Sequence, residues 1–215
     1  MKKINACLFD LDGVLVDTAK YHYLAWRRLA NELGFEFTEY DNERLKGISR
    51  MASLEILLEI GGKTFDEVTK LALTEKKNAW YVEYIAKIHE SEILPGVENF
   101  LKSLRQAGIK TALGSVSKNA MTILKGINLL QYFDAIIDGT KVVNAKPDPE
   151  VFLKGAQELG VAPENCVVFE DAIAGIEAAH SAGMHAVGIG LVETLSTADK
   201  VIPGFKDIPY DILNF

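Results

Sequence analysis

Two carboxylates separated by one residue follow the first apolar segment of the chain. Asp10 and Asp12 come directly after residues 4–9, which read Ile-Asn-Ala-Cys-Leu-Phe. In an extended backbone, a spacing of two places both side chains on the same side. Carboxylates this close repel one another, especially when buried, and a divalent cation removes that conflict. The pair therefore indicates a metal-dependent site.

A second acidic pair, Glu170 and Asp171, ends the apolar run of residues 166–169. Carboxylate oxygens are hard ligands that suit Mg²⁺. With the cation present, one carboxylate can attack phosphorus to form an aspartyl phosphate, and another can exchange a proton with the attacking or leaving oxygen. An isolated Asp-x-Asp is more often a solvated turn, but two acidic pairs at strand ends favour phosphoryl transfer.

Two further clusters offer groups that bind phosphate oxygens. Ser115 supplies a hydroxyl, and backbone N–H groups follow it near a predicted helix N-terminus. The alternative for this segment is a plain helix N-cap by Ser117. Lys146 precedes a proline, which favours extended backbone, and it offers a positive charge for a phosphoryl group. A lone surface lysine is the alternative there.

The elements that must position these residues alternate between short apolar runs and amphipathic segments. Strands are predicted at residues 4–9, 109–113, 135–137, 166–169 and 185–189. Helices are predicted between them at residues 97–107, 119–127, 149–159 and 172–182. This alternation predicts an α/β fold, a Rossmann-like doubly wound parallel sheet with helices on both faces. Ligands bind such sheets at the carboxyl ends of the strands, where the polar clusters stand.

One region interrupts the alternation. Between residues 18 and 92 we find no good strand, and helices are predicted at 19–33, 51–60 and 66–88. We therefore expect an inserted α-helical cap domain at residues 17–92. The α/β core domain would comprise residues 1–16 and 93–215, with hinges near residues 15–17 and 92–95.

Composition excludes several kinds of partner. The 215 residues are 48% hydrophobic and 25% charged, as in ordinary globular proteins, and the formal net charge of -7 disfavours nucleic acid and anionic membranes. Cys7 and Cys166 lie in apolar runs without metal-ligand spacing, which favours a reducing compartment. Neither a signal-peptide core nor a membrane-spanning run is found. We expect a cytoplasmic monomer that acts on a small molecule.

The four clusters together resemble the haloacid dehalogenase (HAD) superfamily of phosphotransferases, over the whole chain. The matching residues are Asp10-Leu11-Asp12-Gly13-Val14, Ser115, Lys146 and Glu170-Asp171. The resemblance implies that Asp10 is the nucleophile and Asp12 the general acid/base. It implies that Ser115 and Lys146 bind the transferring phosphoryl group. The implied Mg²⁺ ligands are the side chain of Asp10, the main-chain carbonyl of Asp12, Glu170 and Asp171.

The predicted cap resembles more closely the sugar-phosphate mutases of that superfamily. The matching segments are residues 17–22, Ala25-Trp26, residues 45–50, Lys77-Asn78 and residues 115–119. The resemblance implies interconversion of β-D-glucose 1-phosphate and D-glucose 6-phosphate through an aspartyl phosphate, with β-D-glucose 1,6-bisphosphate as intermediate and activator. A bisphosphate has two anionic ends, so one end must occupy a basic site away from Asp10.

The resemblance assigns the remaining roles. Thr18 and His22, which share a helix face, are placed beside Asp12 as catalytic residues. Arg50 can hold a phosphate through two parallel hydrogen bonds. The other implied substrate-binding residues are Trp26, Lys46, Gly47, Ser53, Lys77, Ser115, Val116, Ser117, Lys118 and Asn119.

For four of these residues, a purely structural role stays open as the alternative. Trp26 would then belong to the cap's apolar core, and His22 would be a structural hydrogen-bonding residue. Lys77 would share a solvated face with Lys76. Arg50 would cap a helix end or pair with Glu55.

Three rival functions remain. The closest is a HAD-type sugar-phosphate phosphatase, in which water attacks the aspartyl phosphate. A phospho-accepting signalling domain would need neither the cap nor Arg50. A dinucleotide-binding protein is disfavoured because the turn after the first strand is acidic and lacks G-x-G-x-x-G. One departure from the family pattern is Gly114, which stands where alanine is expected.

Overall fold

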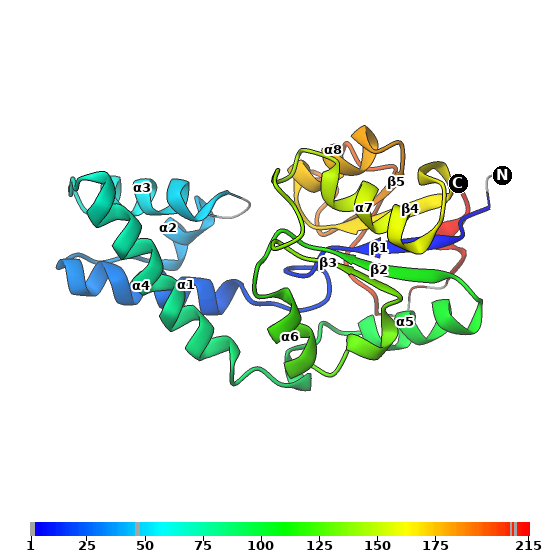
Figure 1. Ribbon diagram of the computed structural model, residues 1–215, viewed down its shortest axis with the longest axis horizontal. Helices are drawn as coiled ribbons and strands as arrows, with labels where there is room; N and C mark the ends of the chain where they lie inside the picture. Colours follow the sequence, from blue (N-terminus) through cyan, green and yellow to red (C-terminus); the bar gives the residue numbers. More distant parts are fainter. Residues whose placement is uncertain (1–2, 46–47, 207, 209) are drawn as a thin grey trace. The chain divides into compact units, whose positions relative to one another are not determined.

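The computed structural model describes residues 3–45, 48–206, 208 and 210–215. It divides the chain into two compact units, one formed by Met1–Asp17 with Ile88–Phe215 and one formed by Thr18–Lys87. We call them the α/β unit and the helical unit (Figure 1). The insertion expected at residues 17–92 is a few residues longer than the helical unit.

The α/β unit is built on one parallel sheet. Its strands are β1 (Ala6–Phe9), β2 (Lys110–Gly114), β3 (Ala135–Ile137), β4 (Cys166–Glu170), β5 (His185–Ile189) and β6 (Lys200–Ile202). Their order is β3-β2-β1-β4-β5-β6, and each neighbouring pair is parallel. The predicted α/β class and the five predicted strands are confirmed. The sixth strand was not predicted.

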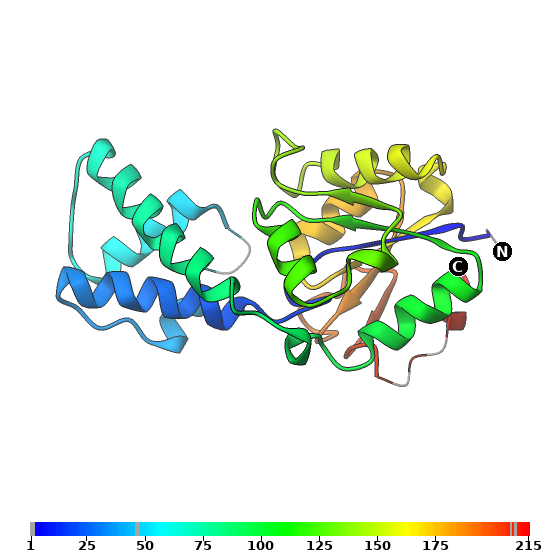
Figure 2. The same ribbon diagram turned by 60° about the horizontal axis from the view of Figure 1, so that its bottom comes forward.

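Helices cover both faces of this sheet, with α5 on one face and α7 and α8 on the other (Figures 1 and 2). The longer helices are α5 (Val97–Gln106), α6 (Ala120–Gly126), α7 (Glu150–Leu159) and α8 (Ile173–Ser181). Short 3-10 turns are η1 (Glu90–Glu92), η2 (Leu130–Tyr132), η3 (Pro163–Asn165) and η4 (Tyr210–Leu213).

Alternating side chains of β1 divide the core between the two faces. Leu8 packs into the cluster that contains Phe152 of α7 and Ile176 of α8. Its neighbour Phe9 points the other way and contacts the ring of Phe100 on α5. Because both faces are covered, β1 reads as a continuous apolar run and all four of its residues are buried.

The helical unit contains α1 (Ala19–Leu33), α2 (Glu39–Glu43), α3 (Arg50–Ile60) and α4 (Glu67–Ile85). Side chains cap three of these helices: Thr38 and Asp41 form a capping box on α2, Ser49 caps α3 and Asp66 caps α4. The helix α2 was not predicted, because five residues are too few for a periodic pattern. Across the described residues, no helix combines the length and apolarity that a membrane span requires.

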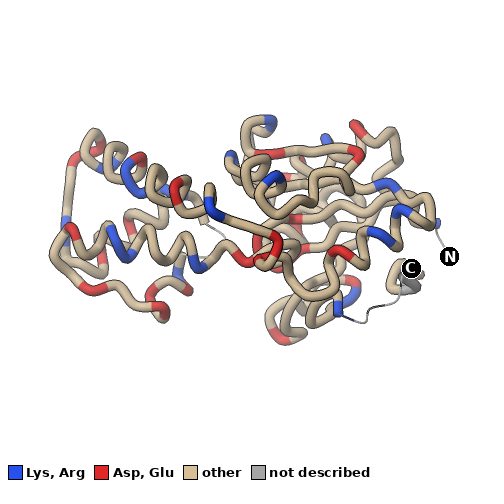
Figure 3. The backbone as a smooth tube through the Cα atoms, turned by 90° about the horizontal axis from the view of Figure 1, so that it is seen from below, with Lys and Arg blue, Asp and Glu red and all other residues tan. Residues whose placement is uncertain are grey.

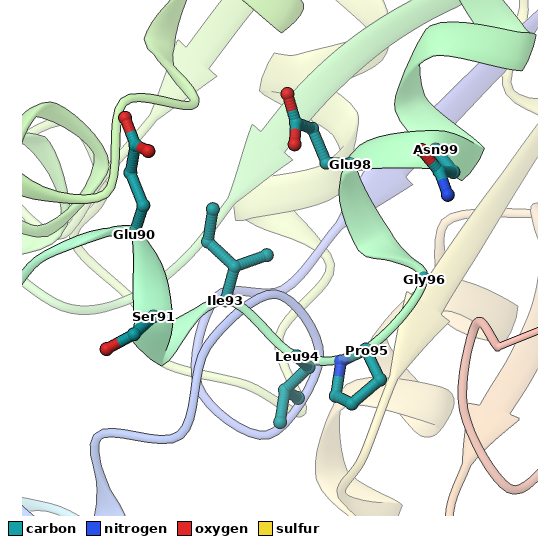
Figure 4. Close-up of a pocket in the computed structure, with 8 residues that line it drawn as sticks. All are labelled: Glu90, Ser91, Ile93, Leu94, Pro95, Gly96, Glu98 and Asn99. Atoms are coloured by element: carbon teal, nitrogen blue, oxygen red, sulfur yellow. The ribbon is translucent and has the colours of Figure 1, made fainter.

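The two chain segments that enter and leave the helical unit lie side by side at the edge of the α/β unit. Val16 bridges to Ile93, and the N–H of Leu94 donates to the carbonyl of Leu15 at 3.0 Å. A pocket lies along the returning segment (Figure 4), lined by Glu90, Ser91, Ile93, Leu94, Pro95, Gly96, Glu98 and Asn99. None of the predicted site residues lines it.

Candidate active site

The strand register brings Asp10 and Glu170 together. Phe9 pairs with Phe169 across β1 and β4, and the N–H of Asp10 donates to the carbonyl of Phe169 at 3.0 Å. Both acids are buried, with 8% of Asp10 and 2% of Glu170 exposed. Carboxylate oxygens of Asp10, Glu170 and Asp171 lie within 4.8 Å of one another. Three of the predicted acids therefore form one cluster.

This acidic cluster fits a hard divalent cation. Burial raises the pKa of Glu170 well above its ordinary value, Lys146 opposes that rise, and the neighbouring charges of Asp10 and Asp171 add to it. Carboxylates crowded in this way are stabilised by a cation, and an all-oxygen donor set is the one that Mg²⁺ prefers. The residues present thus fit the Mg²⁺ expected from the sequence.

Asp12 lies in the turn that follows β1. The strand β1 ends at Phe9 and the backbone bends at Leu11, so Asp12 does not continue the strand. Asp12 instead bridges to Val16 in the turn that follows.

Lys146 reaches the acids from the loop before α7. Its Nζ donates to Asp10 Oδ1 at 2.5 Å and to Glu170 Oε1 at 3.1 Å, and 8% of its side chain is exposed. Burial by itself lowers the pKa of Lys146, but the two carboxylates outweigh burial and raise it above its ordinary value. Lys146 is therefore a buried, charged group of the cluster and not a surface lysine.

Two glycines let the backbone approach these carboxylates. A Cβ added at Gly175, in α8, would lie 1.7 Å from Glu170 Oε1. One added at Gly13, where φ is +76°, would lie 2.0 Å from Asp171 Oδ2. Sequence reasoning missed Gly175. The signal that could have found it is a glycine inside a helical pattern, which usually marks a packing or functional constraint.

The loop after β2 is organised by its own serines. Ser115 is 2% exposed, and its Oγ accepts the N–H of Ser117 at 3.2 Å. The Oγ of Ser117 accepts the N–H of Asn119 at 3.2 Å. Asn119, not Ser117, flanks α6, so the simple N-cap alternative for Ser117 is wrong. Val116 and Lys118 of the same loop are exposed.

A second cluster lies within the helical unit and is formed by basic side chains. Nζ of Lys77 lies 2.8 Å from Nδ1 of His22 and 4.5 Å from the ring centroid of Trp26. Burial, and then the charge of Arg50, lower the pKa of Lys77 to about 7. Burial, and then Lys77 and Arg50, lower the pKa of His22 well below its ordinary value. An anion bound nearby would stabilise the charged forms.

The structure resolves several alternatives in this unit. Lys76 pairs with Glu32 on the surface, whereas Lys77 is 2% exposed, so the two lysines do not share a solvated face. Trp26 is 2% exposed and lies in the apolar core, which was the alternative to a substrate-binding role. Arg50 is exposed on the first turn of α3.

The other predicted residues are distributed as follows. Thr18 is buried beside the start of α1, and Ser53 is buried in α3. Glu55, the partner considered for Arg50, pairs with Lys70 at 2.7 Å. Lys46 and Gly47 lie outside the described residues.

Replacing Lys77 by methionine should stabilise the helical unit at neutral pH. The unfolded lysine holds its proton up to about pH 10.5, whereas the folded one does so only up to about 7. Between these values the unfolded chain binds more protons, so the wild-type free energy of unfolding rises with pH. The variant should lack that rise and should exceed wild type at pH 7 by ~2 kcal/mol, after loss of the cation–π contact.

Urea unfolding followed by tryptophan fluorescence measures this effect, because Trp26 and Trp80 both lie in the helical unit. At pH 10 the gain should shrink or change sign. Lys76→Met is the matched control, since Lys76 is the neighbouring lysine whose ammonium pairs with Glu32 on the surface. Equal effects of Lys77→Met at both pH values would contradict a depressed lysine pKa.

Comparison with known proteins agrees with this architecture. Residues 4–183 match the haloacid dehalogenase-like hydrolase family, and the chain belongs to it. The predicted superfamily is thus confirmed.

Acidic and basic positions are interspersed along the described part of the chain (Figure 3).

Individual relatives match over nearly the full length. A β-phosphoglucomutase of Bacillus subtilis is 42% identical over 213 residues, which cover 98% of this chain and 94% of the relative. A phosphorylated carbohydrates phosphatase of Thermotoga maritima is 36% identical over 202 residues, covering 93% and 90%. The crystal structure of β-phosphoglucomutase from Clostridium difficile matches with a TM-score of 0.88 and 45% identity, covering 98% of this chain and 95% of that one.

Proposed function

We propose that this enzyme is a β-phosphoglucomutase that interconverts β-D-glucose 1-phosphate and D-glucose 6-phosphate through β-D-glucose 1,6-bisphosphate. The observation that carries the proposal is the presence of two separate groups of basic side chains. Lys146 lies among the acids of the α/β unit, while Lys77 and His22, near the charge of Arg50, form a second group in the helical unit. Such a pair suits a substrate with two phosphates.

The chemistry begins at Asp10. A carboxylate oxygen of Asp10 bonds to the phosphorus at C1 of the bisphosphate as the bond from phosphorus to the C1 oxygen breaks, Asp12 gives that oxygen a proton, and glucose 6-phosphate is released. Asp12 then takes a proton from the 6-hydroxyl of a β-D-glucose 1-phosphate, which attacks the aspartyl phosphate, releases Asp10 and forms the bisphosphate again. Lys146 and Ser115 hold phosphoryl oxygens during both transfers.

Mg²⁺ would be held by Asp10, Glu170 and Asp171 with the carbonyl of Asp12. When bound, it neutralises negative charge on the carboxylates and the phosphoryl group. Lys146 contributes a fixed positive charge on the same acids, at 2.5 Å from Asp10 and 3.1 Å from Glu170. Thr18, His22 and Ser53, with Lys46 and Gly47, complete the proposed surroundings of the sugar.

The second candidate is a sugar-phosphate phosphatase, which the similarity to the phosphatase of Thermotoga maritima favours. It would share the first transfer, after which water attacks the aspartyl phosphate. One assay separates the two. β-D-glucose 1-phosphate is supplied with Mg²⁺ and a trace of the bisphosphate, and glucose 6-phosphate and free phosphate are followed separately. Isomer without matching phosphate release is expected. Free phosphate with little isomer would reject the mutase, and conversion of the α-anomer alone would reject the proposed anomer.

Arg50→Ala should separate the two phosphate sites. We expect isomerisation to fall by about 10²-fold, because a bidentate, charge-assisted contact to the distal phosphate is lost. Release of phosphate from a small ester, which has no distal phosphate, should change little. Steady-state rates with both substrates measure this. Arg44→Ala is the control, since Arg44 pairs with Glu59 on an exposed face of the same unit. Equal losses with both substrates would argue against the distal role.

A further inference from the structure

Lys146 has a third neighbour besides the two carboxylates. Its Nζ lies 4.7 Å from the centroid of the Phe152 ring, over the ring face. We propose that Phe152 is a positioning residue for phosphoryl transfer, because its ring holds the ammonium of Lys146 in place. The proposal rests on the proposed role of the Asp10 site, and it does not depend on which sugar is bound.

The ring is a rigid support. Phe152 lies in the first turn of α7, where its N–H donates to the carbonyl of Pro149 at 3.1 Å. It is fully buried in the apolar cluster that also contains Leu8 and Ala112. Lysine, by contrast, carries its charge on a flexible four-carbon stem, so its position depends on what the ammonium contacts.

The ring contact differs in kind from the two carboxylate contacts. When Asp10 becomes an aspartyl phosphate, the negative charge beside Lys146 moves from the carboxylate oxygens to the phosphoryl oxygens, so the ionic partner of Lys146 changes position during the reaction. The face of a neutral aromatic ring attracts a desolvated ammonium throughout, because the ring quadrupole does not change. Phe152 therefore supplies a contact that stays fixed while the ionic partner of Lys146 changes.

The position of the ring depends on Gly114. A Cβ added at Gly114 would lie 2.8 Å from both Cδ1 and Cε1 of Phe152, closer than ordinary contact. Gly114 stands at the end of β2, where the family pattern led us to expect alanine. In this chain the missing methyl group thus leaves space that the Phe152 ring occupies, next to the lysine it supports.

Stepwise fluorination of the Phe152 ring tests the proposal with little change in volume. Each fluorine weakens the negative potential of the ring face, so the kcat for phosphate release from a small ester should fall progressively, by about tenfold in total at trifluorophenylalanine. KM for the ester and thermal stability should change far less than kcat. Phosphate release is shared by mutase and phosphatase, so failure of the sugar assignment leaves this readout intact.

Two controls make the result decisive. The same fluorinations at Phe100, a buried ring on the opposite face of the sheet, should leave kcat unchanged. Gly114→Ala should lower kcat severalfold by displacing the ring, and it should have no further effect when combined with Phe152→Leu. A flat fluorine series at Phe152, or an equal decline at Phe100, would overturn the proposal. Activity retained by Asp10→Asn would instead overturn the proposed function.

Discussion

Asp10→Asn is expected to lower both isomerisation and phosphate release by at least about 10⁴-fold, the scale on which loss of a covalent nucleophile reduces turnover. Asparagine has nearly the same shape, but its amide is a poor nucleophile towards phosphorus. Asp10 is buried, and its Oδ1 lies 2.5 Å from Nζ of Lys146, so its carboxylate is held beside a positive charge. Steady-state rates measure the two losses. In a covalent phosphate labelling experiment, the variant should retain no acid-stable phosphate.

Asp138→Asn is the matched control. Asp138 is also a buried acid just after a strand of the same sheet, and 7% of it is exposed. Its Oδ1 accepts hydrogen bonds from the N–H and the hydroxyl of Thr140, so its role is to hold a turn. This variant should keep its activity within about tenfold and should still be labelled. Labelling of the Asp10→Asn variant at another residue would show that the nucleophile lies elsewhere.

Much of the α/β unit could be predicted from local pattern. Buried strands such as residues 6–9 are apolar throughout because both faces of a parallel sheet are covered. The strand β6 was not predicted, because Lys200–Ile202 is only three residues long and begins with a charged residue. The order of strands could not be read from periodicity, because it depends on how each helix crosses the sheet.

The candidate site was predictable only in part. Asp10 and Glu170 could be placed together because both directly follow or end strands whose carboxyl ends share one edge. The support from Phe152 could not be foreseen, because it depends on a tertiary contact between the loop at Lys146 and α7. The close packing of Gly175 against Glu170 likewise required the observed helix position.

Lys146→Met should reduce both stability and catalysis in the α/β unit. The substitution leaves Asp10, Glu170 and Asp171 clustered without their buried cation. Breaking a buried pair of this kind costs about 3–5 kcal/mol, because the remaining charges stay desolvated. Phosphoryl transfer should fall by about 10²–10³-fold, since a positioned charge no longer faces the phosphoryl oxygens.

Added Mg²⁺ should restore stability to this variant more than it stabilises the wild-type enzyme, because the cation and Lys146 neutralise the same acids. Amide hydrogen exchange in β1 and β4 is the suitable measurement, since both tryptophans report on the helical unit instead. Lys154→Met is the control, because Lys154 pairs with Glu150 on α7 and keeps 40% of its side chain exposed, so little change is expected. If Mg²⁺ stabilised wild type and Lys146→Met equally, the ion would bind away from Asp10 and Glu170, and the metal assignment would be wrong.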